Sequence, residues 1–133
     1  VTERKEKIEK YTIDFEIYEA LTQPINTYSH GMKQKLLVSG ALLPQPKLFI
    51  LDEPLGGLDP RSAKILKSMM REHCQNGGTV FFSSHILEVV ENLCDRIGII
   101  DKGKLIACDT LEKIKKNSDN TLEDIFLELT AHE

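Results

Sequence analysis

The sequence predicts an α/β fold, because strand and helix patterns alternate through its central part. Two short apolar runs, residues 48–51 and 79–83, have the length and composition of strands buried on both faces of a parallel sheet. Between them, Asp59 and Pro60 combine an N-cap with proline at the first helical position, and this helix stops at Gly77. A further helix is predicted over residues 86–93. The order strand, helix, strand, helix predicts a βαβ unit.

Helices and a hairpin are predicted on either side of this unit. Residues 1–21 form an amphipathic helical pattern, and a polar stretch at residues 26–29 leads into a second helix over residues 32–43. Further along, RIGII and KLIAC flank the turn at residues 101–103 and predict a β-hairpin. Two short helices close the chain, and the second opens with a capping box at Thr121. The helix after Pro60 carries Ala63, Leu66, Met70 and Cys74 on one face.

The composition is that of a globular chain with a core of its own. It has 133 residues, 41% of them hydrophobic and 29% charged, with a formal net charge of −4. The acidic balance argues against a nucleic-acid-binding module. The three cysteines are far apart, and we expect reduced, mostly packed thiols of a cytosolic protein. Since the chain starts at Val1, we expect either a processed start or a piece of a longer protein.

Two adjacent carboxylates, Asp52 and Glu53, follow the first predicted strand directly. Ligands of open α/β sheets bind beyond the carboxyl ends of the strands, so both acids lie where a ligand is expected. One could hold Mg²⁺ and the other could orient a water molecule for attack on a phosphoryl group. The alternative is a strand that simply ends in solvated acids.

Two further features are ambiguous on their own. Ser29 can cap the helix that follows it, or Ser29 and Gly31 can form an anion site with the free backbone N–H groups of that helix. His85 follows the second strand, where it is either structural or a contact of a phosphate oxygen. His73 fits a helix C-terminus electrostatically, and the four histidines do not have the spacing of a metal site.

Taken in order, YSHGM, LFILDEP, GLDP and FFSSH resemble four motifs of the ATP-binding-cassette (ABC) ATPase family. YSHGM matches the family signature, usually LSGGQ, and LFILDEP is similar to the Walker B segment with the catalytic glutamate. GLDP resembles the D-loop, and SSH resembles the switch-histidine loop. The resemblance implies a partial P-loop NTPase core of the RecA-like type. Residues 1–43 would belong to a helical subdomain, and residues 44–133 would form the C-terminal part of the ATPase core.

The resemblance also implies a role for each site residue. Asp52 would hold Mg²⁺ through water, Glu53 would polarise the attacking water, and His85 would contact the γ-phosphate of ATP. Asp59 would couple two active sites across a head-to-tail dimer. Ser29 and Gly31 would contact the nucleotide held by the opposite subunit. His30 and Met32 depart from the family pattern, which usually has Gly and Gln there.

The phosphate-binding loop of the family, G-x-x-x-x-G-K-[ST], is not found in the sequence. Residues 98–105 come close, but Leu105 replaces the required hydroxyl residue, and the context is a strand, a turn and a strand. Gly103 is better explained as a hairpin residue. We therefore expect the chain alone to bind ATP weakly or not at all, and a micromolar affinity in a titration would contradict this.

The resemblance predicts an Mg²⁺-dependent ATPase subunit that drives transport, most simply export, through a separate transmembrane permease. No nucleic-acid partner is expected, and the predicted location is the cytoplasmic face of the cell membrane. Two alternatives stay open. One is an ABC-type ATPase that acts outside transport, and the other is a truncated, non-catalytic interaction module of the same fold.

Overall fold

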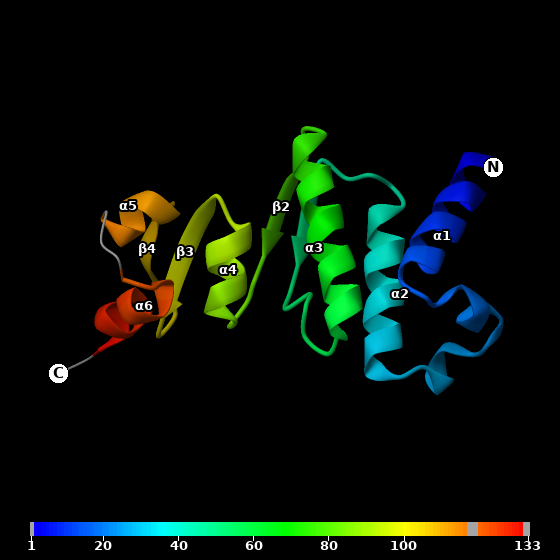
Figure 1. The fold of residues 1–133 in the computed structure, drawn as a ribbon, viewed down its shortest axis with the longest axis horizontal. Helices are drawn as coiled ribbons and strands as arrows, with labels where there is room; N and C mark the ends of the chain where they lie inside the picture. The colour runs from blue at the N-terminus through cyan, green and yellow to red at the C-terminus, as the bar shows by residue number, and fades with distance from the viewer. Residues whose placement is uncertain (1, 117–119, 132–133) are drawn as a thin grey trace. The chain divides into compact units, whose positions relative to one another are not determined.

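A computed structural model describes residues 2–116 and 120–131 of the chain. The elements fall into two compact units, one ending at Ser83 and the other beginning at Ser84. Figure 1 colours the elements from blue at the N-terminus to red at the C-terminus. The predicted α/β class is confirmed, since the first unit contains a parallel strand pair and the second an antiparallel hairpin. The predicted division between residues 43 and 44 stays a prediction.

The first unit begins with two helices, α1 (Thr2–Asp14) and α2 (His30–Leu42), which lie side by side (Figure 1). The predicted helix over residues 1–21 ends early, because Glu16 adopts a left-handed conformation with φ 57°. The reversal buries Phe15 and Ile17, and the N–H of Ile17 donates to the Thr12 carbonyl at 2.9 Å. Two 3₁₀ turns, η1 (Tyr18–Thr22) and η2 (Ile25–Thr27), then lead to α2.

The predicted βαβ unit is confirmed. Strands β1 (Leu48–Leu51) and β2 (Thr79–Phe82) are parallel, with Leu51 opposite Phe82, and α3 (Pro60–Gln75) connects them. Asp59 caps α3 as expected, with Pro60 in the first helical turn. Leu66 and Met70 on the predicted face of α3 are buried, whereas Cys74, one turn further along the same face near the end of the helix, is exposed.

The prediction that both strands are fully buried was wrong. Phe49 is only 3% exposed, but Leu48, Ile50 and Phe81 are 51%, 65% and 66% exposed. Alternate side chains of a strand point to opposite faces, so one face of this sheet packs into the unit and the other meets solvent. Within the described residues of this unit the sheet has two strands only. An apolar run alone cannot reveal how many elements cover it.

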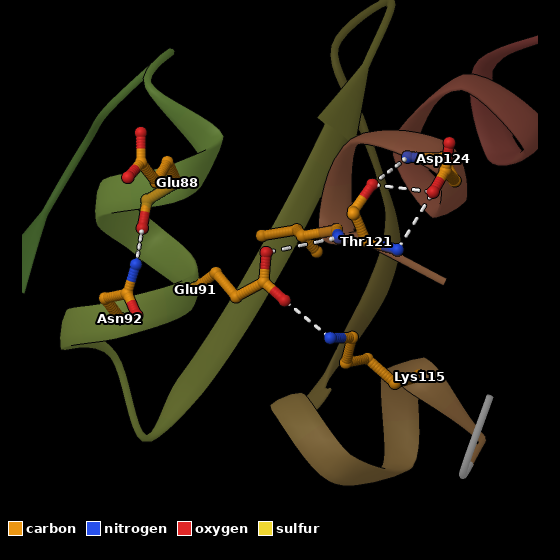
Figure 2. Close-up of polar contacts among 7 residues, drawn as sticks. Glu88, Glu91, Asn92, Lys115, Thr121 and Asp124 are labelled. Atoms are coloured by element: carbon orange, nitrogen blue, oxygen red, sulfur yellow. Dashed lines mark hydrogen bonds and ion pairs between the residues drawn. The ribbon is translucent and has the colours of Figure 1, made fainter. Parts of the chain in front are cut away.

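The second unit contains α4 (Leu87–Leu93), the hairpin of β3 (Arg96–Asp101) and β4 (Lys104–Thr110), and two short helices, α5 (Leu111–Lys115) and α6 (Leu122–Thr130). Lys102 and Gly103 both have positive φ, as a tight hairpin turn requires, so the predicted hairpin is confirmed. Its core is formed by Ile97, Ile99 and Leu122. The predicted capping box of α6 is also confirmed, between Thr121 and Asp124 (Figure 2).

Glu91 of α4 contacts the two other helices of the second unit (Figure 2). Its carboxylate lies 2.5 Å from the Lys115 ammonium of α5 and accepts the N–H of Leu122, the first residue of α6. The hydrogen bond from Lys115 holds the pKa of the Glu91 carboxyl below its usual range. One side chain therefore joins three helices.

The three cysteines are free, as expected. Cys74 and Cys108 are exposed, so the expectation of mostly packed thiols was wrong. Cys94 is half-buried, and burial, with a contribution from the Asp95 carboxylate, raises the pKa of its thiol to about 11. A raised pKa favours the protonated thiol, which is the less nucleophilic form.

Among residues 2–116 and 120–131, no helix combines the length and the apolar character that crossing a membrane requires.

Candidate functional site

The carboxyl ends of β1 and β2 meet at one edge of the sheet in the first unit. Asp52 and Glu53 follow β1, and Ser83 follows β2. The N–H of Ser83 donates to the Leu51 carbonyl at 3.1 Å, so the parallel pairing continues one residue beyond β2. The sequence predicted the acids at this edge, whereas Ser83 was counted as the last residue of the strand and as part of the SSH motif, without a role of its own.

The Ser83 hydroxyl contacts both predicted acidic residues. Its O–H donates to Oδ1 of Asp52 at 2.5 Å, and its oxygen accepts the backbone N–H of Glu53 at 2.9 Å. Asp52 is exposed and Glu53 is half-buried. The two acids are therefore held in a hydrogen-bonded arrangement at the sheet edge and are not merely the frayed end of a strand.

The backbone at Glu53 is left-handed, with φ 44°. Residues other than glycine adopt this conformation at a cost of about 1–2 kcal/mol, and such strain concentrates at functional sites. The Glu53 carbonyl accepts the N–H of Gly56 at 3.0 Å, which starts the loop leading to Asp59. The chain thus reverses sharply at the second acid and carries the predicted D-loop away from the sheet edge.

The N-terminus of α2 packs against this same loop. Ser29 caps the helix by accepting the N–H of Met32 at 3.2 Å. A Cβ added to Gly31 would lie 2.9 Å from the Gly57 carbonyl oxygen, so only glycine fits there without movement. Gly57 itself has φ 75°, and a Cβ there would meet the His30 ring at 2.5 Å. Ser29 and Gly31 are therefore brought to the loop that joins Glu53 to Asp59.

Side chains along α2 strengthen this contact. The amide of Gln34 donates to the Pro54 carbonyl at 3.2 Å, and the Lys35 ammonium lies 3.1 Å from Oδ2 of Asp59. Before the helix, the buried Tyr28 hydroxyl donates to the Ala20 carbonyl at 2.5 Å and fixes the entry to Ser29. None of these anchors was predicted. The sequence does not indicate which distant loop a glutamine or lysine side chain of a helix will contact.

Asp59 is bound within its own chain. Its carboxylate accepts the N–H of Ser62 at 2.9 Å and the Ser62 hydroxyl at 2.7 Å, and Lys35 pairs with it. The hydrogen bonds from Ser62, followed by that from Lys35, hold the pKa of the Asp59 carboxyl well below its usual range. The side chain is still 50% exposed, which leaves room for a further contact from outside. Its predicted role across a dimer stays a prediction.

His85 belongs to the second unit, where it lies in an exposed bend before α4. The neighbouring Ser84 hydroxyl accepts the N–H of Ile86 at 3.1 Å, which shapes this bend. The acids belong to the first unit, so the joint action of His85 with Asp52 and Glu53 stays a prediction.

The oxygen ligands at the sheet edge suit Mg²⁺ better than a softer metal. In the described part of the chain, no group of three or more His, Cys, Asp or Glu side chains is placed to hold a metal ion. Mg²⁺ commonly takes one or two protein carboxylates and completes its shell with water and substrate phosphates. The exposed carboxylate of Asp52 fits this mode of binding.

His73, near the C-terminus of α3, lies elsewhere in the first unit. Its ring packs against Phe49 and Gly78, and its buried Nε2 has no hydrogen-bond partner. It lines a groove with a volume of about 540 Å³ together with Lys47 and Lys10. Lys47 precedes β1 and Gly78 precedes β2, so this groove lies at the opposite end of the strands from the acids.

Comparisons with known proteins identify the family of this chain. The sequence model of a family described as "AAA domain, putative AbiEii toxin, Type IV TA system" matches residues 3–91. The "Uncharacterized ABC transporter ATP-binding protein YdbJ" of Bacillus subtilis is 41% identical over 115 residues, or 86% of this chain and 36% of that protein. The chain belongs to this AAA-domain family and is a homologue of ABC transporter ATP-binding proteins.

Other ABC homologues support this assignment. The "Lantibiotic transport ATP-binding protein SrtF" of Streptococcus pyogenes is 44% identical over 104 residues, which are 78% of this chain and 43% of that protein. A solved structure described as "Structure of ATP binding subunit of ABC transporter" matches with a TM-score of 0.93 and 32% identity. The match covers 98% of this chain and 55% of the chain in the solved structure. The curated relatives are matched over 28% to 48% of their length, so this chain spans less than half of each.

Proposed function

We propose that the protein containing this chain is the ATP-hydrolysing subunit of an ABC transporter. The observation that carries the proposal is the acidic pair at the sheet edge, where one hydroxyl contacts both Asp52 and Glu53. Paired acids at the carboxyl end of parallel strands are well placed for phosphoryl chemistry. The homology to ABC transporter ATP-binding proteins supports ATP as the nucleotide.

Three residues are proposed to act on the nucleotide bound by the same subunit. Asp52 holds Mg²⁺, which neutralises developing phosphate charge when it is bound. Glu53 accepts a hydrogen bond from the attacking water and takes up its proton as a general base. His85 donates a hydrogen bond to the γ-phosphate. The roles assigned to these residues rest on the motif resemblance, to which the hydrogen-bonded position of the two acids gives support.

The start of α2 is proposed to serve a second subunit. Ser29 and Gly31 offer a hydroxyl and close backbone approach to nucleotide held by the opposite subunit of a head-to-tail dimer. Asp59, half-exposed beside α2, couples the two sites across that dimer. The packing of Gly31 on Gly57 supports a joint movement of the signature segment and the D-loop.

The phosphate-binding loop is proposed to be supplied by a part of the ATPase domain not present in these 133 residues. Residues 1–43 are assigned to the helical subdomain and residues 44–133 to the ATPase core. A separate permease forms the membrane passage, so the subunit is peripheral on the cytoplasmic face of the cell membrane. Export is the proposed direction, and the lantibiotic transport in the name of SrtF supports a role in transport.

Replacement of Glu53 tests the proposal in the complete protein. Glu53→Gln keeps the size of the side chain and one accepting oxygen but removes its negative charge and basicity, so we expect kcat to fall about a hundredfold or more while ATP binding is retained. Glu72→Gln, on the exposed surface of α3, is the matched control and is expected to hydrolyse ATP at the wild-type rate. Wild-type turnover by the Glu53 variant would remove this residue from the mechanism.

A further inference from the structure

We infer that Ser83 is a positioning residue for the acidic pair, acting through a single hydroxyl that sets both Asp52 and Glu53. The inference rests on the proposed ATPase function for its effect on turnover. Its structural part rests on the hydrogen bonds alone. Ser83 is separated from the acids by 30 residues of sequence and reaches them only because β1 and β2 are parallel neighbours.

The hydroxyl group is suited to this double task. It has one proton to donate and lone pairs with which to accept, so it can serve a carboxylate and an N–H at the same time. Its proton goes to Oδ1 of Asp52, which leaves the second carboxylate oxygen available for another ligand. Its lone pair takes the N–H of Glu53. Alanine loses both bonds, whereas threonine keeps the hydroxyl.

The hydrogen bond from the Glu53 N–H to the Ser83 hydroxyl stabilises a left-handed backbone conformation at Glu53. With φ 44°, Glu53 is in a conformation that its side chain disfavours, and it persists only where neighbouring contacts impose it. The bond from the Glu53 N–H to Ser83 is such a contact. Ser83 is itself fixed by its N–H bond to the Leu51 carbonyl, so the anchor is part of the sheet. The direction in which the Glu53 side chain leaves the backbone is therefore set from β2.

Loss of the hydroxyl is expected to release both acids without unfolding the sheet. Ser83 is exposed, so its replacement leaves no buried cavity. The strand pairing is made by backbone groups and survives the change. A general base that is displaced by a fraction of an ångström loses rate more than affinity, because binding of the nucleotide does not depend on it.

Hydrogen exchange of the 133-residue chain tests the anchor directly. In Ser83→Ala, the Glu53 amide is expected to exchange about tenfold faster, because its acceptor is gone. The amide of residue 83 is expected to stay protected by the Leu51 carbonyl. Ser83→Thr is expected to keep the wild-type protection, and Ser83→Cys, a weak hydrogen-bonding group, is expected to behave like alanine. Ser68→Ala, on the exposed side of α3, is the control.

Turnover of the complete protein tests the consequence. Ser83→Ala is expected to lower kcat about tenfold to a hundredfold with little change in the KM for ATP, and Ser83→Thr is expected to recover most of the loss. An active wild type with an equally active Ser83→Ala variant would overturn the inference, as would unchanged exchange at Glu53. If the wild type shows no ATP turnover, the proposed function fails, and the exchange experiment alone then decides whether Ser83 anchors the acids.

Discussion

Two glycines of α2 provide a sensitive test of how the signature segment packs. Gly31 lies in the first turn of the helix, against the loop at Gly57, whereas Gly40 lies near the other end with nothing within 4 Å of an added Cβ. Replacing each by alanine adds the same methyl group to the same helix. Any difference in stability therefore reports the contact at Gly31, with helix propensity as the common background.

The expected difference follows from the distances. At Gly40, alanine gains about 1 kcal/mol of helix propensity and meets no neighbour, so the variant is expected to be stabilised. At Gly31, the new Cβ lies 2.9 Å from the Gly57 carbonyl oxygen, while ordinary contact begins at 3.4 Å. Both atoms belong to backbone, so relief requires the helix and the loop to separate. Overpacking of this kind costs about 1–3 kcal/mol and opposes the gain in propensity.

Urea unfolding followed by circular dichroism measures both variants, which is convenient because the chain has no tryptophan. We expect the midpoint of Gly31→Ala to lie below that of Gly40→Ala, with free energies of unfolding about 1–3 kcal/mol apart. If the free energy of unfolding depends on urea concentration with the same slope in both variants, both expose the same amount of surface on unfolding. If Gly31→Ala were as stable as Gly40→Ala, the close approach of α2 to the loop would be refuted.

Two other regions give further predictions. In the second unit, a double-mutant cycle with Glu91→Gln and Lys115→Met is expected to give a coupling of about 1 kcal/mol at neutral pH. Because the folded pKa of Glu91 is lowered, this contribution is present above the usual value of 4.5 and is lost as the pH falls through the folded pKa, so a coupling that is unchanged in acid would contradict the ion pair. On the uncovered sheet face, Ile50 and Phe81 expose apolar surface. The double variant Ile50→Thr, Phe81→Thr is therefore expected to lower the binding of a fluorescent dye for apolar surfaces and the self-association of the chain, without unfolding it. Leu66→Thr on the buried side of the same unit is expected instead to cost about 2–4 kcal/mol, and equal effects of the two changes would contradict the assignment of faces.

Local chemistry made much of the fold predictable. The Asp59 cap, proline at the start of α3, the strands and the hairpin turn at Gly103 are each specified by residues adjacent in sequence, and all were confirmed. The end of α1 was missed because a glutamate, not a glycine, takes the left-handed position at Glu16. The uncovered sheet face was missed because burial depends on how many elements surround a strand. Neither feature can be read from residues taken one segment at a time.

The candidate site was also predictable only where neighbouring residues in the sequence carry the information. Asp52 and Glu53 were singled out because they directly follow an apolar strand and match the Walker B pattern, and their roles stay predictions. Ser83 and Lys35 were not singled out, although they contact Asp52 and Asp59, because each acts across a long gap in the sequence. The motif order fixed the family, but the supporting side chains emerged only from the packing of β2 and α2 around the loop.

The packing of α2 joins the signature segment to the loop that begins at the acids. The helix touches the loop between Glu53 and Asp59 at its start through Gly31, one turn later through Gln34, and beside it through Lys35. The loop in turn begins at a strained residue anchored to Ser83 and ends in a helix cap. A force that shifts the N-terminus of α2 therefore reaches the loop at three points, and the loop is held firmly at both ends. Under the proposed function, a shift of the signature segment would therefore reach the backbone at Glu53 and would link its contact with the opposite subunit's nucleotide to the placement of the Glu53 side chain.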